Sequence, residues 1–163
     1  MKLFKNILTK KEQKDLLKFL KSEVRVLGDT FPGLQTESNL HFNPNPALNT
    51  LLKKVKKYHK NYRIIKCWGL KTTGDFICWH QHDVDLSMVY YLKNKSKIGT
   101  MFQKEKTSVL ITECEENSLS LFLTRPYYVS VLSLIYHLVY HFDVGFLMHK
   151  YYCYLMSVYL PFL

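Results

Sequence analysis

The spacing of apolar residues predicts an amphipathic helix near the start of the chain. Thr9 precedes Lys10-Lys11-Glu12, an arrangement typical of an N-cap residue followed by a carboxylate at the third helical position. Apolar residues then recur on one side of the predicted helix as far as about Ser22: Leu16, Leu17, Phe19 and Leu20. We expect the lysines between them to form a solvated face.

A second helix is predicted after a loop rich in Pro, Gly and Asn that runs from Phe31 to Pro46. Asn45 is suited to cap this helix. Pro46 fits its first position, because proline has no amide hydrogen to leave unpaired there. One face of the predicted helix is apolar up to about His59, through Leu48, Leu51, Leu52 and Val55.

Beyond Asn61 the alternation of apolar and polar residues takes the period of β-strands. The segments 62–70 and 76–79 are separated by turn residues and are predicted to form an antiparallel pair. Further strands are predicted at 86–92, 100–103, 108–112 and 118–122. Two helices followed by a run of short strands predict an α+β fold, with the helices packed against one face of a sheet or barrel.

The chain has 163 residues, which suits a single domain. Lys and Arg outnumber Asp and Glu by 23 to 13, an excess that would suit an anionic partner. No aromatic or Arg-rich surface accompanies the lysines, so the sequence carries no strong signature of nucleic-acid binding. The four cysteines form no CxxC pair and the N-terminus does not read as a signal peptide. We therefore expect reduced thiols in an intracellular, cytoplasmic protein.

The sequence changes character after Phe122, which divides the chain into residues 1–122 and a tail at 123–163. The tail is strongly aromatic and holds eight of the twelve tyrosines, but it has few charged residues. It can be interpreted as buried core strands, as a membrane-associated segment, or as the product of a frameshift that replaced the original closing strands. Membrane association is the weaker interpretation, because His and charged residues interrupt the apolar runs.

His80 and His82 are the first candidates for chemistry. Alternate residues of a strand point to the same face, so two such imidazoles can bind one ion. Asp83 and Asp85 follow closely enough to add a carboxylate, and imidazole plus carboxylate with open positions is typical of non-haem Fe(II) sites. A second pair, His137 and His141, is four residues apart and would share one face of a helix.

A wider pattern surrounds the first pair: Trp68, Gly74-Asp75, His80-x-His82, Asp85-Leu86-Ser87-x-Val89-Tyr90-Tyr91-Leu92, Gly99-x-x-Phe102 and Glu116-Asn117-Ser118-Leu119-x-Leu121-Phe122. This pattern resembles the 2-oxoglutarate- and Fe(II)-dependent oxygenases, especially the small prolyl-hydroxylase-like members found in phages and bacteria. The resemblance implies a double-stranded β-helix, or jelly-roll, core. It also implies Fe(II) bound by a His-x-Asp/His pair and a distal His, and 2-oxoglutarate anchored by a basic residue on the last strand. The strand with Tyr90 and Tyr91 would line the cosubstrate pocket.

The chain departs from this pattern in three ways. One residue is missing between His82 and Asp85, so Asp83 also stays a candidate ligand. Tyr128 stands about where the distal His belongs, and the closing strand with its Arg is absent, which would leave the jelly roll incomplete at the C-terminus. The substitutes on offer are His137 or His141 for the metal and Arg125 or Lys150 for the cosubstrate carboxylate.

The resemblance therefore implies a metal site of His80, His82, Asp85 and His137, with Tyr90 and Arg125 contacting 2-oxoglutarate. The expected activity is hydroxylation of an unknown substrate, either a small molecule or a protein, by an enzyme of a kind that viruses also encode. Two alternatives remain open. One is a catalytically inactive jelly roll that acts as a binding protein, and the other is a small basic protein associated with a membrane or with nucleic acid.

Overall fold

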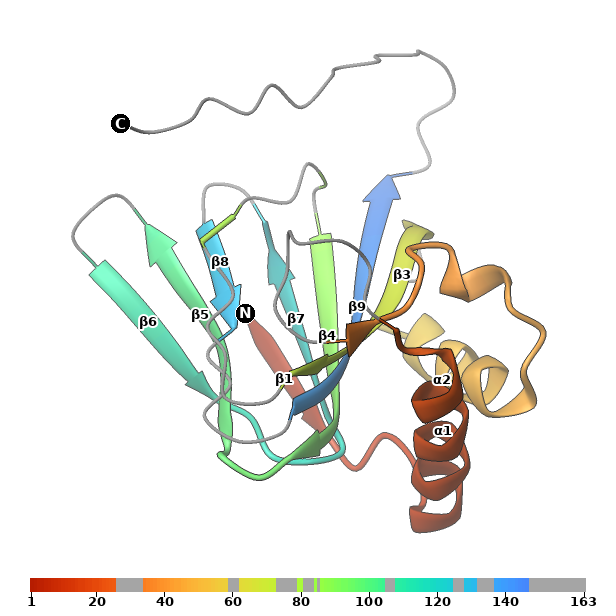
Figure 1. Cartoon of the computed structure of the whole chain (residues 1–163). Helices are drawn as coiled ribbons and strands as arrows, with labels where there is room; N and C mark the ends of the chain where they lie inside the picture. Colours follow the sequence, from red (N-terminus) through yellow and green to blue (C-terminus); the bar gives the residue numbers. More distant parts are fainter. Residues whose placement is uncertain are drawn as a thin grey trace.

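The computed structural model describes residues 1–25, 34–58, 62–72, 79–80, 84, 86–104, 108–124, 128–131 and 137–146. In chain order the elements are β1 (Lys2–Lys5), α1 (Lys10–Glu23), β2 (Leu34–Gln35), the 3-10 helix η1 (Leu40–Phe42), α2 (Pro46–Lys56), β3 (Tyr62–Thr72), β4 (Leu86–Asn94), β5 (Ile98–Lys104), β6 (Ser108–Glu113), β7 (Ser118–Leu123), β8 (Tyr128–Val131) and β9 (His137–Phe146). Figure 1 shows their arrangement.

Both predicted helix starts are confirmed at the level of individual hydrogen bonds. The Thr9 hydroxyl accepts from the Glu12 amide, and the Glu12 carboxylate accepts from the Thr9 amide at 2.7 Å, which completes a capping box. The Asn45 side chain accepts from the Ala47 amide at 2.9 Å, and Pro46 takes the first position of α2. Neither helix among the described residues is long and apolar enough to cross a bilayer.

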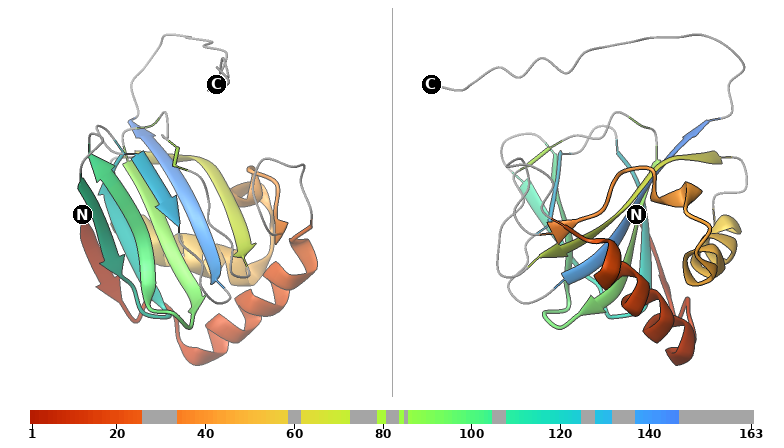
Figure 2. Two further views of the ribbon diagram at one scale, coloured as in Figure 1. Left: turned by 60° about the vertical axis from the view of Figure 1, so that its left-hand side comes forward. Right: turned by 45° about the vertical axis from the view of Figure 1, so that its right-hand side comes forward.

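The strands form two sheets. The larger sheet has the order β1-β7-β4-β9-β3-β2 and the smaller sheet the order β6-β5-β8, with all recorded strand pairs antiparallel. The smaller sheet faces one side of the larger sheet, and the two helices cover the other side, as Figure 2 shows. This is the predicted α+β architecture, with helices packed on a jelly roll.

The core divides into two layers, and β4 contributes to both because its successive side chains point to opposite faces. Residues at even positions of β4, including Met88 and Tyr90, belong to the cluster that packs against the helices. Val89 and Tyr91 belong to a second cluster, which also contains Phe102 of β5 and therefore lies between the sheets. A strand buried on both faces in this way reads as a continuous apolar run.

One close approach fixes how α1 sits on the sheet. A β-carbon added to Gly69 of β3 would collide with the Leu20 side chain of α1. Leu20 is fully buried, so it has little freedom to move aside. Glycine at this position therefore lets the helix pack directly on the strand.

The described strands correct several sequence-based boundaries. Strand β3 continues to Thr72, through residues expected to form a turn, and among the described strands it pairs with β2 and β9. Residues 73–78, which include most of the partner strand predicted at 76–79, lie outside the described part of the chain. The helix considered for His137 and His141 is wrong, because both residues lie in β9.

The apolar tail supplies two strands to the jelly roll. β8 pairs with β5 in the smaller sheet, and β9 lies between β4 and β3 in the larger one. The described part of the tail thus occupies closing positions in both sheets, so the strands themselves are present although the expected Arg is not in them.

Candidate functional site

Two loops that carry candidate ligands meet at one end of the jelly roll. The Thr124 hydroxyl, just after β7, donates a hydrogen bond to the carbonyl oxygen of Val84, just before β4. Leu86 at the start of β4 pairs with Leu123 at the end of β7. Segments that are 40 residues apart in sequence are thereby joined. We call this end of the jelly roll the mouth.

The His80 segment belongs to the same region. Figure 1 shows the short segment 79–80 near the upper end of β8, the end at which β4 begins. His80 itself is half-buried. The other candidates near it, His82, Asp83, Asp85 and Arg125, lie outside the described residues. In the sequence Arg125 directly follows Thr124, and Asp85 directly precedes Leu86.

Tyr90 does not face the space between the sheets. It is fully buried in the cluster beneath the helices, and its hydroxyl donates to the Asn117 side-chain oxygen at 2.8 Å. Asn117 also bonds both the amide and the carbonyl of Leu8, at 2.9 Å and 2.7 Å. Tyr90, for which the resemblance implies a contact with the cosubstrate, is thus bonded to the side chain that links the N-terminal segment to the core.

Tyr91 is the tyrosine that lies between the sheets. Its hydroxyl accepts a hydrogen bond from the Thr100 amide at 2.8 Å and lies 2.6 Å from the Thr100 hydroxyl. Burial strongly raises the pKa of Tyr91, so its phenol stays protonated and keeps a hydrogen that it can donate. The alternation along β4 could have separated Tyr90 from Tyr91, but only the fold shows which face meets the helices.

The register of β9 separates the two candidate histidines of the tail. His137 pairs with Asn94 at the end of β4, whereas His141 pairs with Val89. Eight residues separate Asn94 from Leu86 at the mouth, which corresponds to about 26 Å along an extended strand. His137 therefore lies at the far end of the sheet, and its assignment as a metal ligand beside His80 is not supported by its position. His141 lies three residues from the mouth in the same register.

The described residues do not by themselves complete a metal site. Within the described ranges, no three His, Cys, Asp or Glu residues lie close enough together to hold a metal ion. Nor is any Lys or Arg buried there; the buried polar side chains of those ranges are all uncharged. Cys67 and Cys114 are buried, while Cys78 and Cys153 lie outside the described part.

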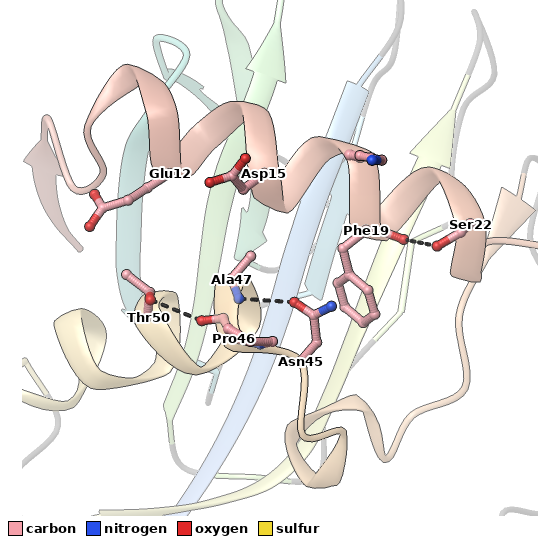
Figure 3. A pocket seen from close by; sticks show the side chains of 9 residues that line it. Glu12, Asp15, Phe19, Ser22, Asn45, Pro46, Ala47 and Thr50 are labelled. Atoms are coloured by element: carbon pink, nitrogen blue, oxygen red, sulfur yellow. Dashed lines mark hydrogen bonds between the residues drawn. The ribbon is translucent and has the colours of Figure 1, made fainter.

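A groove lies on the helix-covered face of the larger sheet. This groove, of about 520 Å³, runs between α1 and α2, and Figure 3 shows Glu12, Asp15 and Phe19 along one side of it. The hydrogen bonds drawn in the groove are local ones within the helices and their caps, such as Thr50 to the Pro46 carbonyl at 2.9 Å. All residues that line the groove belong to α1, α2 and the cap of α2, and none of them belongs to the mouth.

The two facing sheets and the mouth define a fold class. The chain has the jelly-roll fold of the 2-oxoglutarate- and Fe(II)-dependent oxygenases, as comparison with solved structures shows. No protein-family model and no curated protein sequence matches it.

Three solved structures illustrate the similarity. A prolyl hydroxylase from Trichoplax adhaerens, in complex with a hypoxia-inducible-factor peptide, aligns with a TM-score of 0.66 at 15% identity, over 88% of this chain and 82% of that one. A viral collagen prolyl hydroxylase from Paramecium Bursaria Chlorella virus-1, in its 2-oxoglutarate complex, gives 0.64 at 11%, over 88% and 94%. HygX from Streptomyces hygroscopicus, with nickel and 2-oxoglutarate bound, gives 0.64 at 10%, over 89% and 82%.

Proposed function

We propose that this protein is an Fe(II)- and 2-oxoglutarate-dependent dioxygenase that hydroxylates a small molecule or a protein. The observation that carries the proposal is the contact between Thr124 and Val84, because it joins the loop of candidate ligands to the end of β7 within this fold. Similar folds in the viral hydroxylase and in HygX have been crystallised with 2-oxoglutarate, which supports the cosubstrate.

His80, His82 and a carboxylate from Asp85 or Asp83 would hold the metal. Two imidazoles and one carboxylate suit Fe(II) and leave positions open for other ligands. The first residue of β8, Tyr128, pairs with Gln103 and stands at the mouth, where the resemblance implies a distal His. His141 is the nearer of the two tail histidines, and His137 has no role in this proposal.

Tyr91, rather than Tyr90, would contact 2-oxoglutarate. The Tyr91 oxygen accepts from the Thr100 amide, and the Tyr91 and Thr100 hydroxyls share one hydrogen bond of 2.6 Å. This bond uses one of the two hydroxyl hydrogens and would leave the other for a carboxylate of the cosubstrate. Arg125 would act near the mouth instead.

No Lys or Arg is buried in the part of the chain that the structure describes, which makes weak cosubstrate binding an expected property. A carboxylate buried between the sheets would lose its hydration, and the buried polar groups that the structure describes there are hydroxyls, a thiol and an amide rather than Lys or Arg. The same observation favours the second candidate function, a catalytically inactive jelly roll that serves as a binding protein. Bound Fe(II) and 2-oxoglutarate would supply the electrons that let O₂ act as the oxidant of a hydroxylation, so measuring their binding separates the two functions.

The test is an anaerobic titration of the purified protein with Fe(II), with and without 2-oxoglutarate, followed by the weak visible charge-transfer band of the chelated complex. We expect a band that His80→Ala and His82→Ala abolish. His137→Ala is the matched control and should leave the band unchanged, because its residue lies at the far end of β4. Absence of the band in folded wild-type protein would refute the dioxygenase and leave the binding protein.

A further inference from the structure

A β-bulge interrupts strand β3 at the mouth. The pairing of β3 with β9 is regular on either side, but its register shifts between Ile64 and Lys66, and Ile65 is the extra residue. Bulges of this kind often re-aim side chains beside functional sites. Val144 of β9 pairs with Leu86 of β4 on one side and with Ile64 of β3 on the other. The bulge therefore lies level with the start of β4.

The bulge brings two cations to one face of the sheet. Residues 63 and 66 are three apart, so in a regular strand their side chains would point to opposite faces. With the extra residue between them, Arg63 pairs with Gly145 and Lys66 pairs with Asp143. Positions 143 and 145 share one face of β9, and directly paired residues of antiparallel strands share a face as well. Arg63 and Lys66 therefore point to the same side of β3.

That side is the inner face of the larger sheet, which looks toward the smaller sheet. Leu70 lies on it, an even number of residues from Lys66, and belongs to the cluster between the sheets. Exposure rises along this face toward the mouth, from Leu70 at 3% through the half-buried Trp68 to the two exposed cations. The inner face thus becomes accessible to solvent at the bulge, where it is cationic.

Both cations are available to an external anion. Neither takes part in an ion pair within the part of the chain that the structure describes. Gly145, the residue beside Arg63, has no side chain, whereas the residue beside Lys66 is Asp143. The guanidinium of Arg63 thus meets no acid at its own register position, which makes Arg63 the main anion ligand of the pair.

We propose that Arg63 and Lys66 bind an extended acidic segment of a protein substrate; this inference rests on the proposed function and names the class of substrate that the mouth takes. The two cations stand two register positions apart, which corresponds to about 7 Å along a strand. Carboxylates at alternate positions of an extended peptide repeat at the same distance, about 7 Å. Arg63 can hold one carboxylate through two parallel hydrogen bonds, and Lys66 adds a more flexible point charge.

Fluorescence anisotropy of a rhodamine-labelled peptide with aspartate at every second position tests the proposal on the full chain. We expect this peptide to bind more tightly than the same peptide with asparagine, and added salt should weaken its binding. Arg63→Gln and Lys66→Gln should each raise the dissociation constant about threefold to fivefold, near the upper limit for one exposed ion pair. Lys95→Gln is the matched control, since Lys95 is an exposed cation in the turn after β4, at the far end of the sheet.

Charge reversal provides a second test. Arg63→Glu combined with Lys66→Glu should exchange the preference, so that the variant binds a peptide with lysine at every second position. Equal weakening by all three glutamine variants, or equal binding of the aspartate and asparagine peptides, would overturn the proposal. Displacement of the peptide by an equal concentration of tricarballylate would also overturn it, because the site would then be one for small anions.

The anisotropy assay needs neither Fe(II) nor 2-oxoglutarate, which keeps the two proposals distinguishable. A protein that shows the charge-transfer band but does not bind the aspartate peptide would refute the acidic substrate and leave the dioxygenase. A protein that binds the peptide through Arg63 without showing the band would leave the acidic partner and refute the dioxygenase.

Discussion

The hydrogen bond between Tyr90 and Asn117 predicts that Tyr90→Phe lowers stability without affecting the cosubstrate. The substitution removes one hydroxyl and leaves the buried ring in place. The Asn117 oxygen still accepts from the Leu8 amide, so no buried acceptor is stranded. We expect the free energy of unfolding to fall by about 1 kcal/mol, the net value of one intramolecular hydrogen bond.

Asn117→Ala should lower the free energy of unfolding considerably more than Tyr90→Phe does. It removes the bonds to the Leu8 amide, the Leu8 carbonyl and the Tyr90 hydroxyl, all three of which are buried. The backbone of Asn117 has a φ of 64°, a left-handed conformation that asparagine tolerates better than alanine. Three bonds at about 1 kcal/mol each, plus about 1–2 kcal/mol for the backbone, give an expected loss of about 4–5 kcal/mol. Asn117→Gly should lose about 1 kcal/mol less, because it relieves the backbone cost.

Urea unfolding of Tyr90→Phe, Asn117→Ala and the double variant measures these values. In the Asn117→Ala background, Tyr90→Phe should lower the free energy of unfolding much less than it does in the wild type, because the partner of the Tyr90 hydroxyl is already gone. The same proteins are then titrated with Fe(II) and 2-oxoglutarate beside Tyr91→Phe, which we expect to weaken cosubstrate binding. If Tyr90→Phe leaves stability unchanged but weakens 2-oxoglutarate binding, the assignment of Tyr90 to the helix-facing core is wrong.

Three further substitutions test the helix layer and its surroundings. Gln13 is buried and its side-chain amide has no hydrogen-bond partner among the described residues. Gln13→Leu should therefore raise the free energy of unfolding, measured with urea, by about 1 kcal/mol. A lower free energy of unfolding in the variant would mean that the amide does have a partner. Hydrogen bonds from Lys54 and the Thr9 amide lower the pKa of Glu12 from 4.5 to about 2. The contribution of ionised Glu12 to the free energy of unfolding should therefore be complete above pH 4.5 and disappear as the pH falls towards 2. The melting temperature of Glu12→Gln should accordingly depend less on pH across that interval than the melting temperature of the wild type does. Burial lowers the pKa of His41 below 6.5, so the unfolded chain binds this proton more readily and stability should fall as the pH drops below 6.5; a wild-type pH profile identical to that of His41→Gln would contradict this.

The sequence by itself determined the features that depend on a few neighbouring residues. Thr9 and Glu12 cap α1 because they are three positions apart, and Asn45 with Pro46 starts α2 for an equally local reason. The continuous apolar run of β4 could be read in the same way. The resemblance that predicted the jelly roll rests on short spacings of this kind.

The tertiary structure decided everything that depends on which face or which end of a strand meets the rest of the chain. Tyr90 and Tyr91 are adjacent in sequence, yet one bonds Asn117 beneath the helices and the other lies between the sheets. The register of β9 sends His137 to the far end of β4. Leu8 and Asn117, which are 109 residues apart, form buried hydrogen bonds that no local pattern announces. Local spacing fixes conformation within a turn or a strand, whereas these contacts arise only when distant segments pack together and their buried polar groups must find partners.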